Sequence, residues 1–290
     1  MNLPNFLLCG AQRSGTTSLY HYLVQHPAVF MASQKEIHFF SKEYAKGLAW
    51  YAGHFTDANM ATVIGEASPT YMDTPGVAAR IAQHLPDVKL CFLLRNPIDR
   101  AYSSYWHSIA MGKSLNESFS AAIRSPEGYA RYVQRGFYMQ YLTEYLNYFE
   151  RSQIHIILTG ELNRDPQQVL RNCFAFMEID GSFEPNTAVQ FNASQSASGQ
   201  VNLSLLHKWR QVKRVVLRSQ LISPAWRRKT APLRTAVARV LLPQVNHQVP
   251  TMNPDDYAYL AEIYAEANAS LFAFLKRPSP WQERVVISEN

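Results

Sequence analysis

Cysteine is scarce in this sequence, with three among 290 residues. Cys9, Cys91 and Cys173 lie far apart and form no C-x-x-C pair, which argues against a disulfide framework or a zinc site. The first two lie in apolar runs, so we expect buried thiols and a reducing compartment. Since the N-terminus leads directly into an expected strand, it leaves no room for a signal peptide, and we expect a cytoplasmic protein.

Long apolar runs are also missing. No apolar stretch approaches the ~20 residues that a membrane-spanning helix needs, so we expect no membrane span. Hydrophobic residues make up 47% and charged residues 17% of the chain, which is typical of a globular protein with a core. The length fits one large α/β domain, and we expect a single domain over residues 1–290.

Acidic residues are absent from residues 185–254, although the chain has 22 of them. The same segment holds ten basic residues: Lys208, Arg210, Lys213, Arg214, Arg218, Arg227, Arg228, Lys229, Arg234 and Arg239. The rest of the chain therefore has 28 − 10 = 18 basic and 22 acidic residues, a balance of −4. The net charge of +6 thus comes from one segment.

Apolar residues at helical spacing within this segment predict a basic helical subregion at about residues 200–250. Two interpretations stay open. The segment is a helical lid whose cations are only solvated, or residues 208–239 attract an acidic acceptor or an anionic membrane surface.

A lysine is missing from the loop that begins the chain's most informative motif. The apolar run 6–9 predicts a buried strand, and Gly10 and Gly15 bound the loop that follows it. A nucleotide-triphosphate loop reads G-x-x-x-x-G-K-[ST], but Thr16 occupies the lysine position here. Arg13 is the only cation left in the loop. A glycine loop before a helix binds anions, so these residues indicate a phosphate site for a donor other than ATP, with a plain glycine turn as the less favoured alternative.

Strands and helices are expected to alternate over the first 180 residues. Apolar runs predict strands at residues 63–66, 88–94 and 154–158, and helical spacing predicts helices between them. This alternation predicts an α/β fold with a central parallel sheet and helices on both faces. Arg95 follows the 88–94 strand and therefore lies at the carboxyl edge, where open sheets of this kind bind ligands.

The stretch KEIHFF, residues 35–40, places ionisable residues beside two aromatic ones. If Phe39 and Phe40 shield Glu36 from water, the pKa of Glu36 rises and suits it to proton abstraction. The alternative is a solvated pair of Lys35 and Glu36 beside a buried aromatic anchor.

Together these motifs resemble sulfotransferases that use 3′-phosphoadenosine 5′-phosphosulfate (PAPS), of the heparan-sulfate type and its bacterial relatives. The resemblance is carried by GAQRSGTTSL at residues 10–19, KEIHFF at 35–40, GEASPTY at 65–71 and LLRNPIDRAYSSY at 93–105. It implies a P-loop-like three-layer fold, PAPS as sulfuryl donor and no metal. The family's donor-binding positions correspond here to Arg13, Ser14, Gly15, Thr16, Thr17, Ser18, Arg95 and Ser103, and its catalytic ones to Glu36, His38, Arg13 and Lys35.

In that family the Glu is the catalytic base and the His lies beside it, so the resemblance gives these roles to Glu36 and His38. It also assigns Arg95 and Ser103 to the 3′-phosphate and the 10–19 loop to the 5′ end. Two departures stand out. Residues 194–199 replace a Lys-Gly-Arg cluster that closes over the 3′-phosphate in many relatives, and Arg13 replaces a lysine, which keeps the charge and adds a planar fork.

The expected reaction moves the sulfuryl group in line from PAPS to a hydroxyl or amine. The sequence leaves a saccharide, a lipid and a small secondary metabolite open as acceptors. The alternatives are a P-loop nucleotide kinase, disfavoured by Thr16, and a non-catalytic nucleotide- or nucleic-acid-binding protein. Nucleic acid is disfavoured as a partner because the basic segment carries no recognisable nucleic-acid-binding motif.

Overall fold

The computed structural model describes residues 2–111, 117–188 and 249–281. These residues belong to a compact unit made of residues 1–107, 116–193 and 252–290, except for 108–111 and 249–251, which belong to a second unit. The basic subregion predicted at about residues 200–250 lies outside the described residues, as does the 194–199 segment. The expectation of a single domain therefore stays a prediction.

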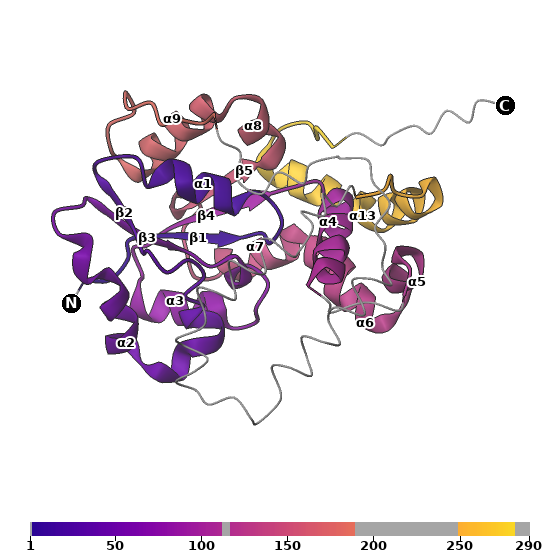
Figure 1. The fold of residues 1–290 in the computed structure, drawn as a ribbon, viewed down its shortest axis with the longest axis horizontal. Helices are drawn as coiled ribbons and strands as arrows, with labels where there is room; N and C mark the ends of the chain where they lie inside the picture. Colours follow the sequence, from indigo (N-terminus) through magenta and orange to yellow (C-terminus); the bar gives the residue numbers. More distant parts are fainter. Residues whose placement is uncertain (1, 112–116, 189–248, 282–290) are drawn as a thin grey trace, which may run out of the picture. The chain divides into compact units, whose positions relative to one another are not determined.

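A five-stranded parallel sheet has the strand order β2-β3-β1-β4-β5 (Figure 1). Its strands are β1 (Phe6–Gly10), β2 (Val29–Met31), β3 (Val63–Ala67), β4 (Lys89–Leu94) and β5 (Ile154–Leu158). The predicted parallel sheet is confirmed, and the predicted strand ends differ from the observed ones by at most one residue. Strand β1 pairs with both β3 and β4, so it lies at the centre of the sheet.

Helices connect the strands and continue beyond the last one. The α-helices are α1 (Thr16–Leu23), α2 (Leu48–Ala52), α3 (Val77–His84), α4 (Pro97–Ala110), α5 (Phe119–Arg124), α6 (Pro126–Gly128), α7 (Tyr138–Leu146), α8 (Thr159–Arg164), α9 (Pro166–Met177) and α13 (Pro254–Leu275). Short 3-10 or π turns are η1 (Phe39–Glu43), η2 (Tyr44–Lys46), η3 (Gly53–Ala58), η4 (Pro69–Tyr71), η5 (Tyr129–Val133), η6 (Gln134–Gly136) and η7 (Arg151–Gln153).

Local signals explain where several helices begin. Asn96 Oδ1 accepts a hydrogen bond from the backbone N–H of Ile98 at 2.9 Å, so it caps α4. Asp165 caps α9 in the same way through Gln168 N, at 2.9 Å. In both helices proline occupies the first position, where its missing N–H costs nothing.

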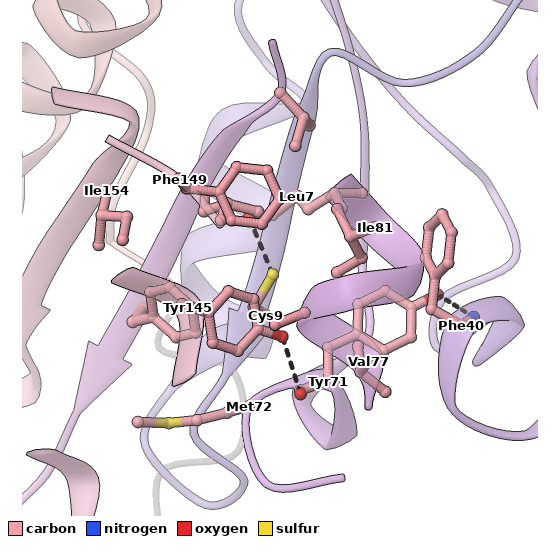
Figure 2. Packing of buried hydrophobic residues seen from close by; sticks show 14 of the residues in the cluster. Leu7, Cys9, Phe40, Tyr71, Met72, Val77, Ile81, Tyr145, Phe149 and Ile154 are labelled. Carbon is pink, nitrogen blue, oxygen red and sulfur yellow. Dashed lines mark hydrogen bonds between the residues drawn. The ribbon is translucent and has the colours of Figure 1, made fainter. Parts of the chain in front are cut away.

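The alternating side chains of β1 divide the core into two layers. Leu7 and Cys9 pack into one cluster, to which α3, α7 and α13 contribute buried residues (Figure 2). Phe6 and Leu8 belong to the other cluster, which receives side chains from α1, α8 and α9. Helices therefore cover both faces of the sheet, as the sequence predicts for a three-layer fold. All three cysteines are buried and free, as expected.

No helix among residues 2–111, 117–188 and 249–281 is long and apolar enough to cross a membrane.

Candidate functional site

The sheet's topology brings the loops after β1 and β4 together. From β1 the chain continues to β2 on one side of the sheet, whereas from β4 it continues to β5 on the other. Since β1 and β4 are neighbours, their carboxyl ends form the point where open α/β sheets bind ligands. The 10–19 loop and Arg95 meet there.

Backbone geometry makes two glycines necessary in the loop after β1. A Cβ on Gly10 would lie 2.6 Å from Met72 Cβ and 3.1 Å from Pro69 O, which leaves no room for a side chain. Gly15 has φ 96° and is the N-cap of α1, where no side chain caps the helix. The N–H groups of the first turn of α1 have no acceptor within the helix, and its dipole adds partial positive charge. The loop therefore has the features of an anion site.

The hydroxyl residues of the loop are mostly turned into the protein. Ser14, Thr16 and Ser18 are buried, so we expect them to reach a phosphate through backbone N–H groups rather than hydroxyls. Thr17 is partly exposed, and its Oγ1 accepts a hydrogen bond from Lys35 Nζ. This bond joins the phosphate loop to the KEIHFF stretch.

Arg13, Arg95 and Ser103 form a cationic cluster. Arg13 Nε donates a hydrogen bond to Ser103 Oγ at 3.2 Å, so the residues assigned to the 5′ and 3′ ends of the donor are in contact. Burial lowers the pKa of Arg13, and the nearby charge of Arg95 lowers it further. Two partly buried like charges are unfavourable until an anion lies between them. The cluster therefore fits a phosphate-bearing ligand.

Arg135 is a residue of this region that sequence reasoning missed. Its Nη1 donates to Gln12 Oε1 at 2.7 Å, and its Nε pairs with Asp73 Oδ2 at 3.2 Å. Arg135 therefore holds the side chain of Gln12 in the phosphate loop from η6. These residues come from three separate segments, and no sequence spacing connects them. A small hollow lies here, lined by Ala11, Gln12, Pro69, Met72, Asp73, Arg100 and Arg135.

Glu36 and His38 lie side by side, with 3.3 Å between Glu36 Oε2 and His38 Nε2. Both residues have left-handed backbone angles, φ 60° and 58°. Such angles are unfavourable for non-glycine residues and need support from their surroundings. The support comes from the segment after β3, because Glu36 N donates to Ala67 O at 3.0 Å and His38 N donates to Ser68 Oγ at 3.0 Å.

Of the two interpretations of residues 35–40, the structure contradicts the one in which the aromatic rings shield Glu36 and raise its pKa. Phe39 and Phe40 do not cover its carboxylate: both rings are buried in the core, where Phe39 stacks on Tyr51 at 4.4 Å between centroids. The Glu36 side chain is 47% exposed. The hydrogen bond from His38 lowers the pKa of Glu36 and outweighs the opposing effect of burial, and the charge of Lys35 adds to the lowering. Glu36 is therefore ionised at neutral pH.

Lys35 does not act mainly as an ion-pair partner of Glu36. Burial lowers the pKa of Lys35, with a smaller opposing effect from the Glu36 charge. Its ammonium group donates to Thr17, so the structure places this cation at the first turn of α1. The predicted catalytic residues and the predicted donor loop are thus joined by a direct hydrogen bond.

Comparison with known proteins shows which family the chain belongs to. The family model described as "Sulfotransferase domain" matches residues 3–224. The bifunctional heparan sulfate N-deacetylase/N-sulfotransferase 1 of Caenorhabditis briggsae is 33% identical over 214 residues, 67% of this chain and 25% of the relative. The membrane-associated sulfotransferase kil1 of Dictyostelium discoideum is 44% identical over 110 residues, 37% of this chain and 23% of the relative.

Among solved structures, a sulfotransferase from Alicyclobacillus acidocaldarius aligns with a TM-score of 0.69 and 27% identity, covering 97% of this chain and 99% of that one. The chain spans about a quarter of the length of the curated relatives it matches. Since the family model covers well over half of the chain, from before β1 to beyond α9, the protein belongs to the sulfotransferase family.

Proposed function

We propose that the protein transfers the sulfuryl group of PAPS to a hydroxyl or amine of an acceptor. The observation that carries this proposal is the hydrogen bond between Lys35 and Thr17. It joins the stretch that carries an ionised carboxylate, Glu36, to the anion-binding turn of α1. Transfer from a phosphate-bearing donor requires a base and an anion site that are held close together, and the bond from Lys35, the neighbour of Glu36, supplies this link.

The residues proposed to bind PAPS fall into two groups, one for the 5′ end of the donor and one for its 3′-phosphate. The first-turn N–H groups of α1, from Thr16 onward, and the guanidinium of Arg13 suit the 5′ end. Arg95 and Ser103 suit the 3′-phosphate. Bound there, PAPS supplies an activated sulfuryl group. Hydrogen-bond donors that are already fixed in place stabilise the negative charge that develops on the leaving group, because they do not have to reorganise during the reaction.

Glu36 is the base in this proposal. Its lowered pKa keeps it ionised at neutral pH, and its side chain is half exposed, so an acceptor has access to it. The acceptor's proton passes to Glu36 while the acceptor oxygen or nitrogen attacks sulfur. The bond between sulfur and the 5′-phosphate oxygen breaks, and 3′-phosphoadenosine 5′-phosphate leaves. His38 keeps the carboxylate in place through the contact at 3.3 Å.

A glycan is the acceptor class we favour. The curated relatives include heparan sulfate N-sulfotransferases by name, from Caenorhabditis briggsae and Homo sapiens, with 33% and 35% identity. A lipid or a secondary metabolite is the alternative.

Thermal unfolding with three ligands separates this proposal from its rivals. A ligand at a hundred times its Kd stabilises a protein by about 2.7 kcal/mol. We expect 3′-phosphoadenosine 5′-phosphate (PAP) to raise the Tm, and ATP with magnesium or an oligonucleotide to leave it unchanged. A Tm raised only by ATP with magnesium would favour a kinase. Mass spectrometry of glycan extracts incubated with PAPS then detects added sulfate.

Glu36→Gln tests the base. The amide keeps the size of the side chain but cannot take a proton, so we expect turnover to fall by a factor of ~100 or more while PAP binds as before. Product formation from PAPS and the Kd of PAP are the two measurements. The control is Glu262→Gln, which changes an exposed carboxylate of α13. Near-normal turnover of Glu36→Gln would remove Glu36 from the mechanism.

A further inference from the structure

A line of hydrogen bonds continues behind the pair of Glu36 and His38. His38 Nδ1, on the side of the ring away from Glu36, lies 2.9 Å from Thr70 Oγ1. Thr70 Oγ1 in turn lies 2.9 Å from Ser41 Oγ. Thr70 belongs to η4, directly after β3, and is 8% exposed. The line therefore runs from a half-exposed carboxylate into the protein.

The backbone on both sides of the His38 ring is held independently of Thr70. His38 N donates to Ser68 Oγ, which itself donates to the buried carboxylate of Glu66 at 2.7 Å. Phe40 N donates to Tyr71 OH at 3.3 Å (Figure 2). With the backbone fixed, what Thr70 controls is the orientation of the His38 ring and the place of its proton.

A neutral imidazole has one N–H and one lone pair, so its two partners must be of opposite kinds. The Glu36 carboxylate accepts only, and it faces Nε2. The proton of a neutral His38 must then be on Nε2, and Nδ1 needs a donor. The hydroxyl of Thr70 can donate to Nδ1 while its oxygen accepts from Ser41, whose hydroxyl has His38 O at 3.4 Å as a second, longer acceptor. The opposite tautomer would point a lone pair at the carboxylate.

We propose that Thr70 is a positioning residue that keeps the proton of His38 on Nε2, so that the Glu36 carboxylate is held in one orientation for the acceptor. The role rests on the proposed function of Glu36 as base. In each turnover the acceptor's proton passes to Glu36, and the N–H of His38 stays where it is. In this scheme Thr70 contacts neither the sulfuryl donor PAPS nor the acceptor substrate.

Other charges act on the same pair. Lys35 and Lys42 also lower the pKa of Glu36, and the charges of Glu43 and Glu66 lie close enough to interact with His38. None of these groups changes when the Thr70 hydroxyl is removed. A change in the titration of Glu36 in such a variant therefore reports on His38.

Thr70→Val removes the hydroxyl and keeps the shape. Without a fixed N–H on His38 Nε2, the pKa of Glu36 should rise toward its ordinary value, since the His38 hydrogen bond is its largest lowering cause. Activity requires the ionised carboxylate and is lost as pH falls through its pKa, so the acidic limb of kcat/KM should move to higher pH. We expect kcat to fall about tenfold, with the Kd of PAP unchanged.

Two further variants serve as controls. Thr70→Ser keeps the hydroxyl, so the acidic limb of its kcat/KM profile should lie at the same pH as in the wild type. Thr74→Val removes a neighbouring hydroxyl that donates to Thr70 O at 2.7 Å and does not touch His38, so the pH profile should stay as in the wild type. An equal loss of kcat in Thr70→Val and Thr74→Val, with unmoved limbs, overturns the proposal.

Nitrogen-15 NMR of histidine-labelled protein tests the tautomer without any turnover. We expect His38, assigned with His38→Asn, to carry its proton on Nε2 in the wild type and to lose that preference in Thr70→Val. A proton on Nδ1 in the wild type overturns the proposal. If the protein transfers no sulfuryl group, the proposed function fails separately, and the NMR result still decides the role of Thr70 toward His38.

Discussion

Arg13 lies in the loop after β1 and Ser103 lies on α4, and one hydrogen bond of 3.2 Å joins them. Arg95 adds a second positive charge to this contact. The groups proposed for the two ends of the donor therefore share one electrostatic environment. A substitution at one end should be felt at the other, because residues in contact seldom contribute additively.

We expect Arg95→Ala to weaken the binding of PAP by roughly 1.5–3 kcal/mol, the range for a hydrogen bond to a charged group. The binding of adenosine 5′-phosphosulfate, which lacks the 3′-phosphate, should be weakened much less. Isothermal titration with both ligands measures the difference. Arg164→Ala, at an exposed arginine of α8, is the matched control. Equal weakening of both ligands would show that Arg95 does not contact the 3′-phosphate.

Several residues of the site could be predicted from the sequence because they belong to contiguous motifs. The loop with Gly10, Gly15 and Arg13 is one, and Glu36 with His38 is another. The pKa of Glu36 could not be predicted, because the direction of its shift depends on whether the rings of Phe39 and Phe40 turn into the core or cover the carboxylate. The contact of Arg135 with Gln12 and that of Thr70 with His38 join distant segments, so only the folded chain shows them.

At the scale of elements, α13 is fixed to the segment before α7. Tyr264 OH donates to Val133 O at 2.6 Å, and its ring packs against Phe137. A Cβ on Gly136 would lie 2.7 Å from the Tyr264 ring and 2.8 Å from Pro97 Cβ. Gly136 is therefore required by the close approach of three elements, η6, α4 and α13.

Gly136→Ala should lower the free energy of unfolding by about 1–3 kcal/mol, the usual cost of overpacking a core. Urea denaturation measures it. In Gly160→Ala, the added methyl group meets nothing within 4 Å in helix α8, so we expect no loss and a gain of up to ~1 kcal/mol from helix propensity. Comparable destabilisation in both variants would contradict the proposed close approach.

Elements with local signals were the ones predicted well. Strand Ile154–Leu158 was predicted at its observed position, because an apolar run is a signal contained within a few residues. The π turn at Phe39–Glu43 was not predicted. Its residue Phe40 donates its backbone N–H to Tyr71 OH, and no pattern within 39–43 signals that partner.

For the whole molecule, the uneven charge is the feature that leads to a prediction. Residues 185–254 carry ten cations and no acid, and the rest of the chain has a balance of −4. Such a segment attracts anionic partners over a distance set by the ionic strength.

Changing Arg210, Arg214 and Arg218 to Gln should raise the KM of an acidic acceptor, with a smaller effect in high salt. The affinity for PAP should stay the same. Steady-state kinetics at two salt concentrations measures the effect, and Arg164→Gln serves as the control. If the KM of the acceptor is unchanged and PAP binds more weakly, the segment binds the 3′-phosphate instead.

The central place of β1 decides when the site can form during protein synthesis. Phe6 pairs with Gly65 and with Lys89, so the first strand made has to wait for much later residues. A parallel sheet offers no hairpin that could shield it earlier. An emerging chain therefore exposes the apolar run before the phosphate loop until β4 has left the ribosome. This is the interval in which a chaperone has most to protect.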